Sequence, residues 1–338
     1  MSEFPPEVTV VVPAYNVTKY IGPALDSVLS QTLQNFEIIV VNDGCPDTAA
    51  LDRALEPYLS RIRYIKQKNK GLSGARNTAI LAAQAPLIFL LDPDDWVEPS
   101  GLEQQVRLMR EHPEYDAAYC NSFCFAESPL AAAKWGKLDN KLVMEVYPSA
   151  GPVSLCSIMD GRTGPRCPGA IVRRETLMRI GLFDEGLRCE EDLDMWLRIL
   201  KADPPGQIGY THEPLIHYRL RCDSLTMDRG HAQALVDVME KAGRTLDLTD
   251  DERQCLARRL ALNRYDLEII RGKQAIGERR WKDAVRSFEY CQAYSPQRKT
   301  GTILSLLKTF PLAAFAATRA WEIYLEKRLQ RGSRRGTL

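Results

Sequence analysis

Apolar runs and helix-period segments alternate through the first 120 residues of the chain. Four short runs, apolar at almost every position, predict buried strands at residues 8–12, 36–41, 62–65 and 85–91. Between them apolar residues recur at helical spacing, which predicts helices near residues 20–29, 51–59 and 72–83. Such an alternation indicates an α/β fold with a mainly parallel sheet and helices on both faces. Because ligands bind at the carboxyl ends of such strands, we expect function in the loops after the first, second and fourth strands and at the start of the third helix.

Beyond residue 120 the pattern changes twice. Residues 127–168 hold several prolines and glycines among weakly periodic positions, and we expect a long loop there that helps to select a substrate. From His231 onward only helical periodicity remains. Within it, four residues have the spacing of one tetratricopeptide-like helical hairpin, namely Gly272, Ala284, Phe288 and Pro296. A single repeat cannot bury its own face, so it should pack on the rest of the protein or on a partner. A plain two-helix appendage is the alternative.

Composition narrows the class of protein. The chain has 338 residues, enough for about two domains, and its 45 basic and 44 acidic residues leave a net charge of +1. Without a basic field, nucleic acid is not an expected partner. The nine cysteines include no C-x-x-C pair, and we expect them to be reduced thiols. Residues 1–7 are acidic and proline-rich, unlike a signal peptide, which predicts a cytoplasmic location.

Three aspartates end the fourth expected strand: Asp92, Asp94 and Asp95. Pro93 cannot donate to a sheet ladder and favours an extended Asp92, so the strand should stop here and present Asp92 and Asp94 at its carboxyl edge. Closely spaced carboxylates suit Mg²⁺ or Mn²⁺, which bridge to substrate phosphates. We therefore expect Asp92 and Asp94 to hold a divalent cation. The alternative is an acidic turn that caps the next helix.

The other loops lack the glycine fingerprint of a dinucleotide-binding domain. The first turn, residues 13–16, reads Pro-Ala-Tyr-Asn, which favours a metal-bound nucleoside diphosphate over NAD chemistry. Asp43 can accept from a pyrimidine imide or a ribose hydroxyl, or it can form an Asx turn with Gly44. Gly71 permits close backbone approach at the third helix, where Arg76 could bind a base carbonyl or a phosphate, or could be a solvated surface charge.

Together these segments resemble the glycosyltransferase family 2 pattern of the GT-A fold. The resemblance is carried, in chain order, by residues 11–16, 27–32, 36–44, 71–77 and 91–95, and it continues through 181–185, 191–198, 213–219 and 224–226. It implies a catalytic domain over residues 1–228, with a nucleotide-sugar half at 8–120 and an acceptor half at 121–228. A helical region would follow at 229–338.

The resemblance also implies a reaction. It is the inverting transfer of a sugar from a nucleotide-diphospho-sugar, expected to be a UDP-sugar, to an acceptor hydroxyl in glycan or cell-surface polysaccharide synthesis. The acceptor would be a glycan or lipid-linked, and the cofactor Mn²⁺ or Mg²⁺. Nucleotide and donor contacts are then assigned to Pro13, Tyr15, Asn16, Asp43, Gly71, Arg76, Asp92, Asp94 and Asp95. The general base is assigned to Asp192.

The segment around Asp192 has a helical pattern of its own. Apolar residues recur at i, i+3, i+4 and i+7 from Leu193, and Asp192 lies one turn before Trp196 at the edge of that face. Acidic residues in a first helical turn are also favoured by the helix dipole whatever their function. We expect Glu191 and Trp196 on the acceptor side, beside the base. Farther along, His217 and Arg219 could reach the diphosphate, or His217 could be a satisfied core or rim residue.

The last residues of the chain have two interpretations. Trp321 and Tyr324 precede a basic tail at residues 327–335, which suits peripheral contact with an anionic membrane at its inner face. A docked helix with a disordered basic end is the alternative.

Two other functions are alternatives to sugar transfer. One is a metal-dependent nucleotidyltransferase, which would need a glycine-rich first turn, and the other is a non-catalytic scaffold with a vestigial transferase domain.

Overall fold

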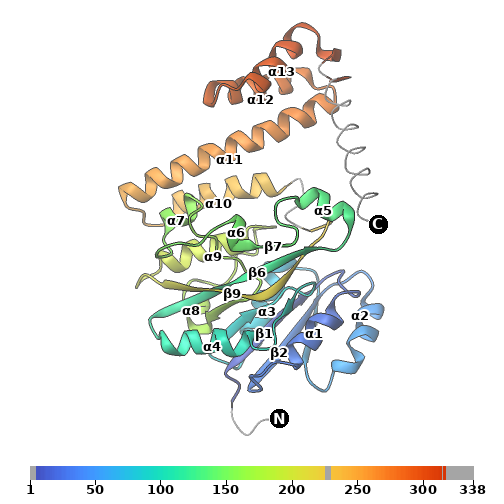
Figure 1. Ribbon diagram of the computed structural model, residues 1–338, viewed down its shortest axis with the longest axis vertical. Helices are drawn as coiled ribbons and strands as arrows, with labels where there is room; N and C mark the ends of the chain where they lie inside the picture. The colour runs from blue at the N-terminus through green and yellow to red at the C-terminus, as the bar shows by residue number, and fades with distance from the viewer. Residues whose placement is uncertain (1–4, 225–229, 314, 317–338) are drawn as a thin grey trace.

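A single mixed sheet organises the molecule (Figure 1). The computed structural model describes residues 5–224, 230–313 and 315–316. In that part of the chain the sheet has nine strands, which are β1 Val8–Ala14, β2 Phe36–Asp43, β3 Arg63–Gln67, β4 Leu87–Leu90, β5 Trp96–Val97, β6 Tyr115–Ala126, β7 Lys141–Leu142, β8 Ala170–Arg173 and β9 Gln207–Leu220. Their order is β3-β2-β1-β4-β8-β6-β9-β5, with β7 paired to β6.

The two halves of the sheet differ in direction. β1 pairs in parallel with β2 and β4, and β2 with β3, as the alternating pattern predicts. Beyond β4 the sheet is mixed, because β8 runs antiparallel to both β4 and β6, and β5 runs antiparallel to β9. The predicted strands of the first half are confirmed. β6 and β9 pair in parallel, but the antiparallel pairings of this half have no counterpart in the sequence pattern, which predicted a mainly parallel sheet.

Helices cover both faces of the sheet and extend beyond it. Those that flank the sheet are α1 Ile21–Leu29, α2 Thr48–Leu55 with a 3₁₀ turn at Glu56–Tyr58, α3 Gly71–Ala82, α4 Gly101–Glu111, α8 Arg174–Arg179 and α9 Glu191–Leu200. The C-terminal helices are α10 His231–Thr245, α11 Asp250–Gly277, α12 Trp281–Tyr294 and α13 Arg298–Thr309. None of the described helices is both long enough and apolar enough to cross a membrane.

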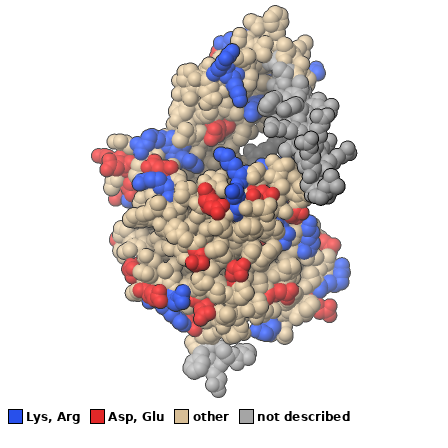
Figure 2. Space-filling view, viewed as in Figure 1, with Lys and Arg blue, Asp and Glu red and all other residues tan. Residues whose placement is uncertain are grey.

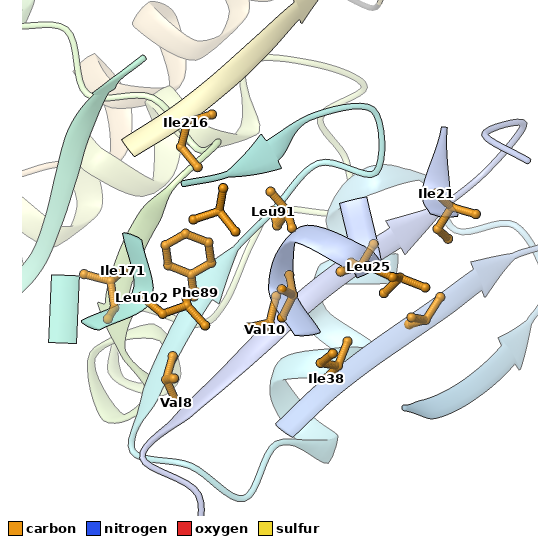
Figure 3. Close-up of a cluster of buried hydrophobic side chains, with 14 of the residues drawn as sticks. Val8, Val10, Ile21, Leu25, Ile38, Phe89, Leu91, Leu102, Ile171 and Ile216 are labelled. Carbon is orange, nitrogen blue, oxygen red and sulfur yellow. The ribbon is translucent and has the colours of Figure 1, made fainter. Parts of the chain in front are cut away.

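Alternation along each strand divides the core in two. Val8 and Val10 of β1 join Phe89 in a cluster under α1 and α4, which Figure 3 shows together with Leu25 and Leu102. Val11 of β1 points to the opposite face and packs under α3 and α9. Both faces of the central strands are therefore buried, and their polar loops are left at the sheet edge.

The segment 127–168 is more regular than expected. It forms three short helices, α5 Pro129–Trp135, α6 Val143–Val146 and α7 Leu155–Met159. Ser128 caps the first, accepting from the backbone N–H of Ala131 at 3.2 Å, and Ser154 forms a capping box on the third. Both serines are N-cap residues that indicate helix starts in the sequence. The prolines and glycines of the segment led to the prediction of a loop instead.

The first C-terminal helices are packed against α7 and α9. Apolar residues of α10 and of the start of α11 share a cluster with Leu155 of α7 and Leu197 of α9, and Figure 1 shows α10 and α11 over this side. A disulfide joins Cys156 in α7 to Cys255 in α11. The expectation that all nine cysteines are reduced is therefore wrong for this pair, which tertiary contact brings together across 99 residues.

The end of α11 forms a helical hairpin with α12. Phe288 of α12 is fully buried there, and a Cβ added at Gly272 would lie 2.8 Å from its ring. The close approach explains why a glycine stands at this spacing. On the face drawn in Figure 2, acidic and basic side chains are interspersed, in keeping with the near-zero net charge. Trp321, Tyr324 and the basic tail lie outside the described residues.

Candidate active site

Three aspartates follow β4 in a tight turn, closed by the N–H of Asp95 donating to the carbonyl of Asp92 at 3.1 Å. Asp92 and Asp94 remain 25% and 20% exposed, whereas Asp95 is buried. β5 follows directly and α4 begins only at Gly101, so these carboxylates do not cap a helix. Asp92 and Asp94 therefore lie at the carboxyl edge of the sheet, as predicted.

Asp95 has a different environment from its neighbours. Its Oδ1 accepts from the backbone N–H of Arg219 at 2.7 Å, and its Oδ2 is buried without a hydrogen-bond partner among the described residues. Burial, and then the charges of Asp94 and Asp92, hold its pKa well above the ordinary aspartate range. Asp95 thus fastens the turn to β9, and its burial removes it from direct contact with a donor.

Two arginines neutralise the exposed pair. Arg76 Nη2 lies 2.9 Å from Asp92 Oδ1, and Arg221 Nη1 lies 3.0 Å from Asp94 Oδ2. Even so, burial and the charge of Asp92 raise the pKa of Asp94. Arg219, near the end of β9, and Arg221, which directly follows that strand, both lie over the ring of Tyr20, at 5.1 and 4.5 Å. The edge of the sheet thus presents alternating carboxylate and guanidinium groups.

Arg221 was not singled out from the sequence, although its spacing from Arg219 was a usable signal. Arg221 directly follows β9, and like Arg219 it contacts Asp94. His217, also on β9, stacks on Trp96 with ring centroids 5.0 Å apart and hydrogen-bonds Glu98. It is a rim residue that is already paired.

Arg76 connects this turn to a second acidic cluster. Its side chain is 2% exposed, so it is not the solvated charge that was the alternative. Besides Asp92, it contacts Glu191 at 2.5 Å and lies over the ring of Phe183. The start of α9 is thereby held against the carboxyl edge of β4.

The second cluster occupies the first turn of α9. Glu191 is committed to Arg76, and Asp194 is buried between Arg198 and Lys241, at 2.7 Å from each. Asp192 is partly exposed and accepts from the N–H of Leu193. Burial, followed by the charges of Glu191 and Glu190, raises the pKa of Asp192 to about 7. Of these acids, Asp192 is the one poised to exchange a proton near neutral pH.

Trp196 does not lie where the sequence placed it. It is fully buried in the core beneath α9, so it supports the helix and presents no surface to an acceptor. Glu191 is likewise 5% exposed and acts through its ion pair with Arg76.

The predicted nucleotide residues gather at the ends of β1 and β2. Pro13 is buried in β1, and the exposed residues Tyr15 and Asn16 follow it, Asn16 with a left-handed φ of 55°. Asp43 ends the neighbouring strand, where its Oδ1 accepts from Gln67 Nε2 at 2.7 Å and from the N–H of Lys70 at 2.8 Å. Asp43 is thus tied to the loop before α3 and forms no turn with Gly44.

Gly71 begins α3 with φ of 78°, and a Cβ there would meet nothing within 4 Å. Glycine is therefore favoured at this position by the left-handed backbone and not by lack of space. The backbone here is open to the approach of a ligand.

Part of the chain is similar to known proteins of one family. Residues 9–149 match the family model described as Glycosyl transferase family 2. EpsH of Bacillus subtilis (strain 168), whose name assigns it to the glycosyltransferases, is 42% identical over 225 residues, covering 65% of this chain and 62% of EpsH. An uncharacterized glycosyltransferase of Rickettsia felis is 28% identical over 205 residues, 59% of this chain. The matched part is 32% of that relative's length, so the chain spans about a third of it.

Solved structures show the same fold. S. aureus TarS 1-349 in complex with UDP-GlcNAc superposes with a TM-score of 0.63 at 18% identity, covering 98% of this chain and 92% of the other. The mannosyltransferase PcManGT of Pyrobaculum calidifontis, in complex with GDP-Man and Mn²⁺, gives 0.58 at 18% identity, covering 95% and 88%. Residues 9–149 therefore carry a glycosyltransferase family 2 domain, and the chain has the GT-A fold of these solved structures.

Proposed function

We propose that the protein is an inverting glycosyltransferase that moves a sugar from a nucleotide-diphospho-sugar, a UDP-sugar, to an acceptor hydroxyl in glycan or surface-polysaccharide assembly. The donor diphosphate lies at the carboxyl edge of β4, and Asp192 is the general base. The observation that carries this proposal is the two-sided contact of Arg76, which brings α9 and Asp192 to the aspartates of the β4 turn.

The nucleotide would occupy the ends of β1 and β2. Tyr15 is exposed and can stack on a base, while Asp43 and the open backbone at Gly71 border the same edge. Relatives of this fold bind UDP-GlcNAc and GDP-Man. Of UDP-sugars and GDP-sugars, we propose a UDP-sugar as the donor.

Asp192 would take the proton of the acceptor hydroxyl as the oxygen attacks the anomeric carbon. A carboxyl with a pKa of about 7 is a stronger base than an ordinary aspartate and is still half ionised at neutral pH. One displacement then forms the bond to the acceptor oxygen and breaks the bond to the diphosphate oxygen, which inverts the anomeric centre.

A divalent cation fits the residues of the β4 turn. Asp92 and Asp94 offer partly exposed oxygen donors, and the pKa of Asp94 is raised first by burial and then by the charge of Asp92, which a cation would offset. No group of three or more His, Cys, Asp or Glu arranged to hold a metal occurs within the described residues, so the remaining ligands would be diphosphate oxygens and water. Bound there, Mn²⁺ or Mg²⁺ would stabilise charge on the leaving diphosphate.

The test begins with a panel of nucleotide sugars, each measured for thermal stabilisation with Mn²⁺ and with chelator. The stabilising donor is then incubated with candidate acceptors, and the anomeric configuration of the product is read by NMR. We expect inversion relative to the donor. Retention of configuration, or transfer of a nucleotidyl group instead of the sugar, would overturn the proposed reaction.

A further inference from the structure

The first C-terminal helix reaches the acidic cluster of α9. His231, the first residue of α10, contacts Glu190 with its Nε2 2.7 Å from Oε1. Both side chains are largely buried, at 25% and 19% exposed. Because a hydrogen bond to Glu190 favours the charged imidazole, followed by smaller contributions from the charges of Glu190 and Asp192, the pKa of His231 is raised.

Glu190 has an unusual backbone for its position. It is the N-cap of α9 with φ of 61°, a left-handed conformation that costs free energy in a residue other than glycine. Its carbonyl accepts from the N–H of Asp194, closing the first helical turn. The side-chain contact with His231 therefore holds in place a strained residue that directs the first turn of α9, two positions before Asp192.

α10 is itself fixed on α9, so His231 has a defined place. Lys241 binds Asp194 at 2.7 Å and Asp184 at 2.6 Å, while Val238 and Leu197 share one apolar cluster. The helix is thus anchored at its far end by ion pairs, and His231 stands at its near end.

We propose that His231 is a positioning residue for Asp192, acting through Glu190 and through its own positive charge. This rests on the proposed function, in which Asp192 is the general base. The C-terminal helical region then supplies part of the catalytic machinery and is more than an appendage.

The charges around Asp192 show why a cation is needed here. On its own helix and cap it faces Glu190 and Glu191, from α3 it faces Arg76, and from the segment before β8 it faces the buried thiol of Cys167. Arg76 is already shared between Asp92 and Glu191. His231, from α10, is the further cation that acts on this group.

The test compares His231→Ala with His231→Gln across a pH series with the full chain. Removing the imidazolium and freeing Glu190 both disfavour the Asp192 carboxylate. In His231→Ala the acid limb of kcat/KM should move up by about one pH unit, which at a pH below the limb is about a tenfold loss. Donor KM should be unchanged. Glutamine can donate a hydrogen bond to Glu190 without carrying charge. In His231→Gln the plateau kcat should therefore match the wild type, while the acid limb of the pH profile stays displaced.

Gln233→Ala is the matched control, because Gln233 lies only two residues beyond His231 on α10 but bonds Asp237 and Arg271 instead of Glu190. It should keep the wild-type profile. A wild-type pH profile and kcat in His231→Ala, or a loss confined to thermal stability and shared by Gln233→Ala, would overturn the role of His231.

Asp192→Asn in the same series separates the two proposals. Full transfer by Asp192→Asn overturns the base assignment and the positioning role together. Inactive Asp192→Asn with an unaltered His231→Ala overturns the positioning role alone.

Discussion

Two acidic clusters lie on either side of Arg76, and they are built in different ways. In the turn after β4, Asp92 and Asp94 each face an arginine, and Asp95 is enclosed against β9. At the start of α9, Glu191 and Asp194 are also committed to cations, whereas no direct ion pair to Asp192 occurs within the described residues. An aspartate side chain is thus paired with an arginine in the turn after β4, as at Asp92 and Asp94, and is without a direct ion pair at Asp192 in the part of the chain that the structure describes.

The difference teaches that partners, more than residue type, set the role of a carboxyl. Arginines beside Asp92 and Asp94 favour negative charge, which suits a diphosphate-and-cation site. Burial beside two other acids raises the pKa of Asp192 to about 7, which suits proton transfer. Pairs of groups whose environments separate their pKa values are typical of catalytic sites.

The largest expected effect is on Asp192. Asp192→Asn keeps the shape but cannot take a proton, so kcat should fall by about 10²–10⁴-fold with donor affinity unchanged. Single-turnover transfer and donor calorimetry measure the two quantities. Glu175→Gln is the control, because Glu175 is an exposed first-turn acid of the neighbouring helix α8. Equal activity in Asp192→Asn and wild type would remove the contrast between the clusters.

Arg76→Met should break both clusters at once. It leaves buried Glu191 and half-buried Asp92 without their shared cation, which costs about 3–5 kcal/mol of unfolding free energy. Urea denaturation followed by circular dichroism measures this cost. Arg53→Met, at an exposed position of α2, is the control. Its unfolding free energy should stay within about 0.5 kcal/mol of the wild-type value. An equally small loss in Arg76→Met would show that the pairing is not needed to hold α9.

The pH dependence tests Asp192 without mutation. The base must be ionised to act, so kcat/KM should rise with pH through about 7 and fall about tenfold per unit below it. Activity that is flat between about pH 5 and pH 8 would place the base at a group that does not titrate in that range.

Asp94→Ala should affect cation-dependent donor binding and spare the fold. We expect at least about a tenfold loss of UDP affinity in the presence of Mn²⁺, on the scale seen when groups around a metal are removed. Titration calorimetry with Mn²⁺ and with chelator measures it. Asp95→Asn provides the contrast, since Asp95 is enclosed against β9 and should leave the Mn²⁺ dependence intact. Unchanged Mn²⁺-dependent affinity in folded Asp94→Ala would remove the cation site.

The smallest effect is expected at Asp194. Asp194→Asn removes the charge that Arg198 and Lys241 share, which should lower the unfolding free energy by about 1.5 kcal/mol and loosen α10. Transfer at saturating substrate should change far less than in Asp192→Asn. Asp237→Asn, on the exposed side of α10, is the control. A collapse of kcat in Asp194→Asn comparable to that of Asp192→Asn would mean that the two acids do not have separate roles.

The local pattern of the chain determined the donor half. Apolar runs and turn residues predicted β1 to β4 and the placement of Asp43, Asp92 and Asp94 at strand ends, because strand period and proline geometry depend on near neighbours. The same reasoning predicted the helix from Leu193 with Asp192 at the edge of its apolar face, whereas the choice of Asp192 as base came from the family resemblance. The spacing of Gly272 and Phe288 also predicted a helical hairpin, which α11 and α12 form.

Only the tertiary structure decided which of these residues act together. Arg76 meets Glu191 from 115 residues away, Cys156 meets Cys255 from 99 away, and His231 reaches Glu190 from another helix. The antiparallel half of the sheet and the full burial of Trp196 and Asp95 were also unmarked in the sequence. Periodicity tells which face of an element is buried. What that face meets depends on how distant elements pack, and the pKa of a carboxyl depends on those partners.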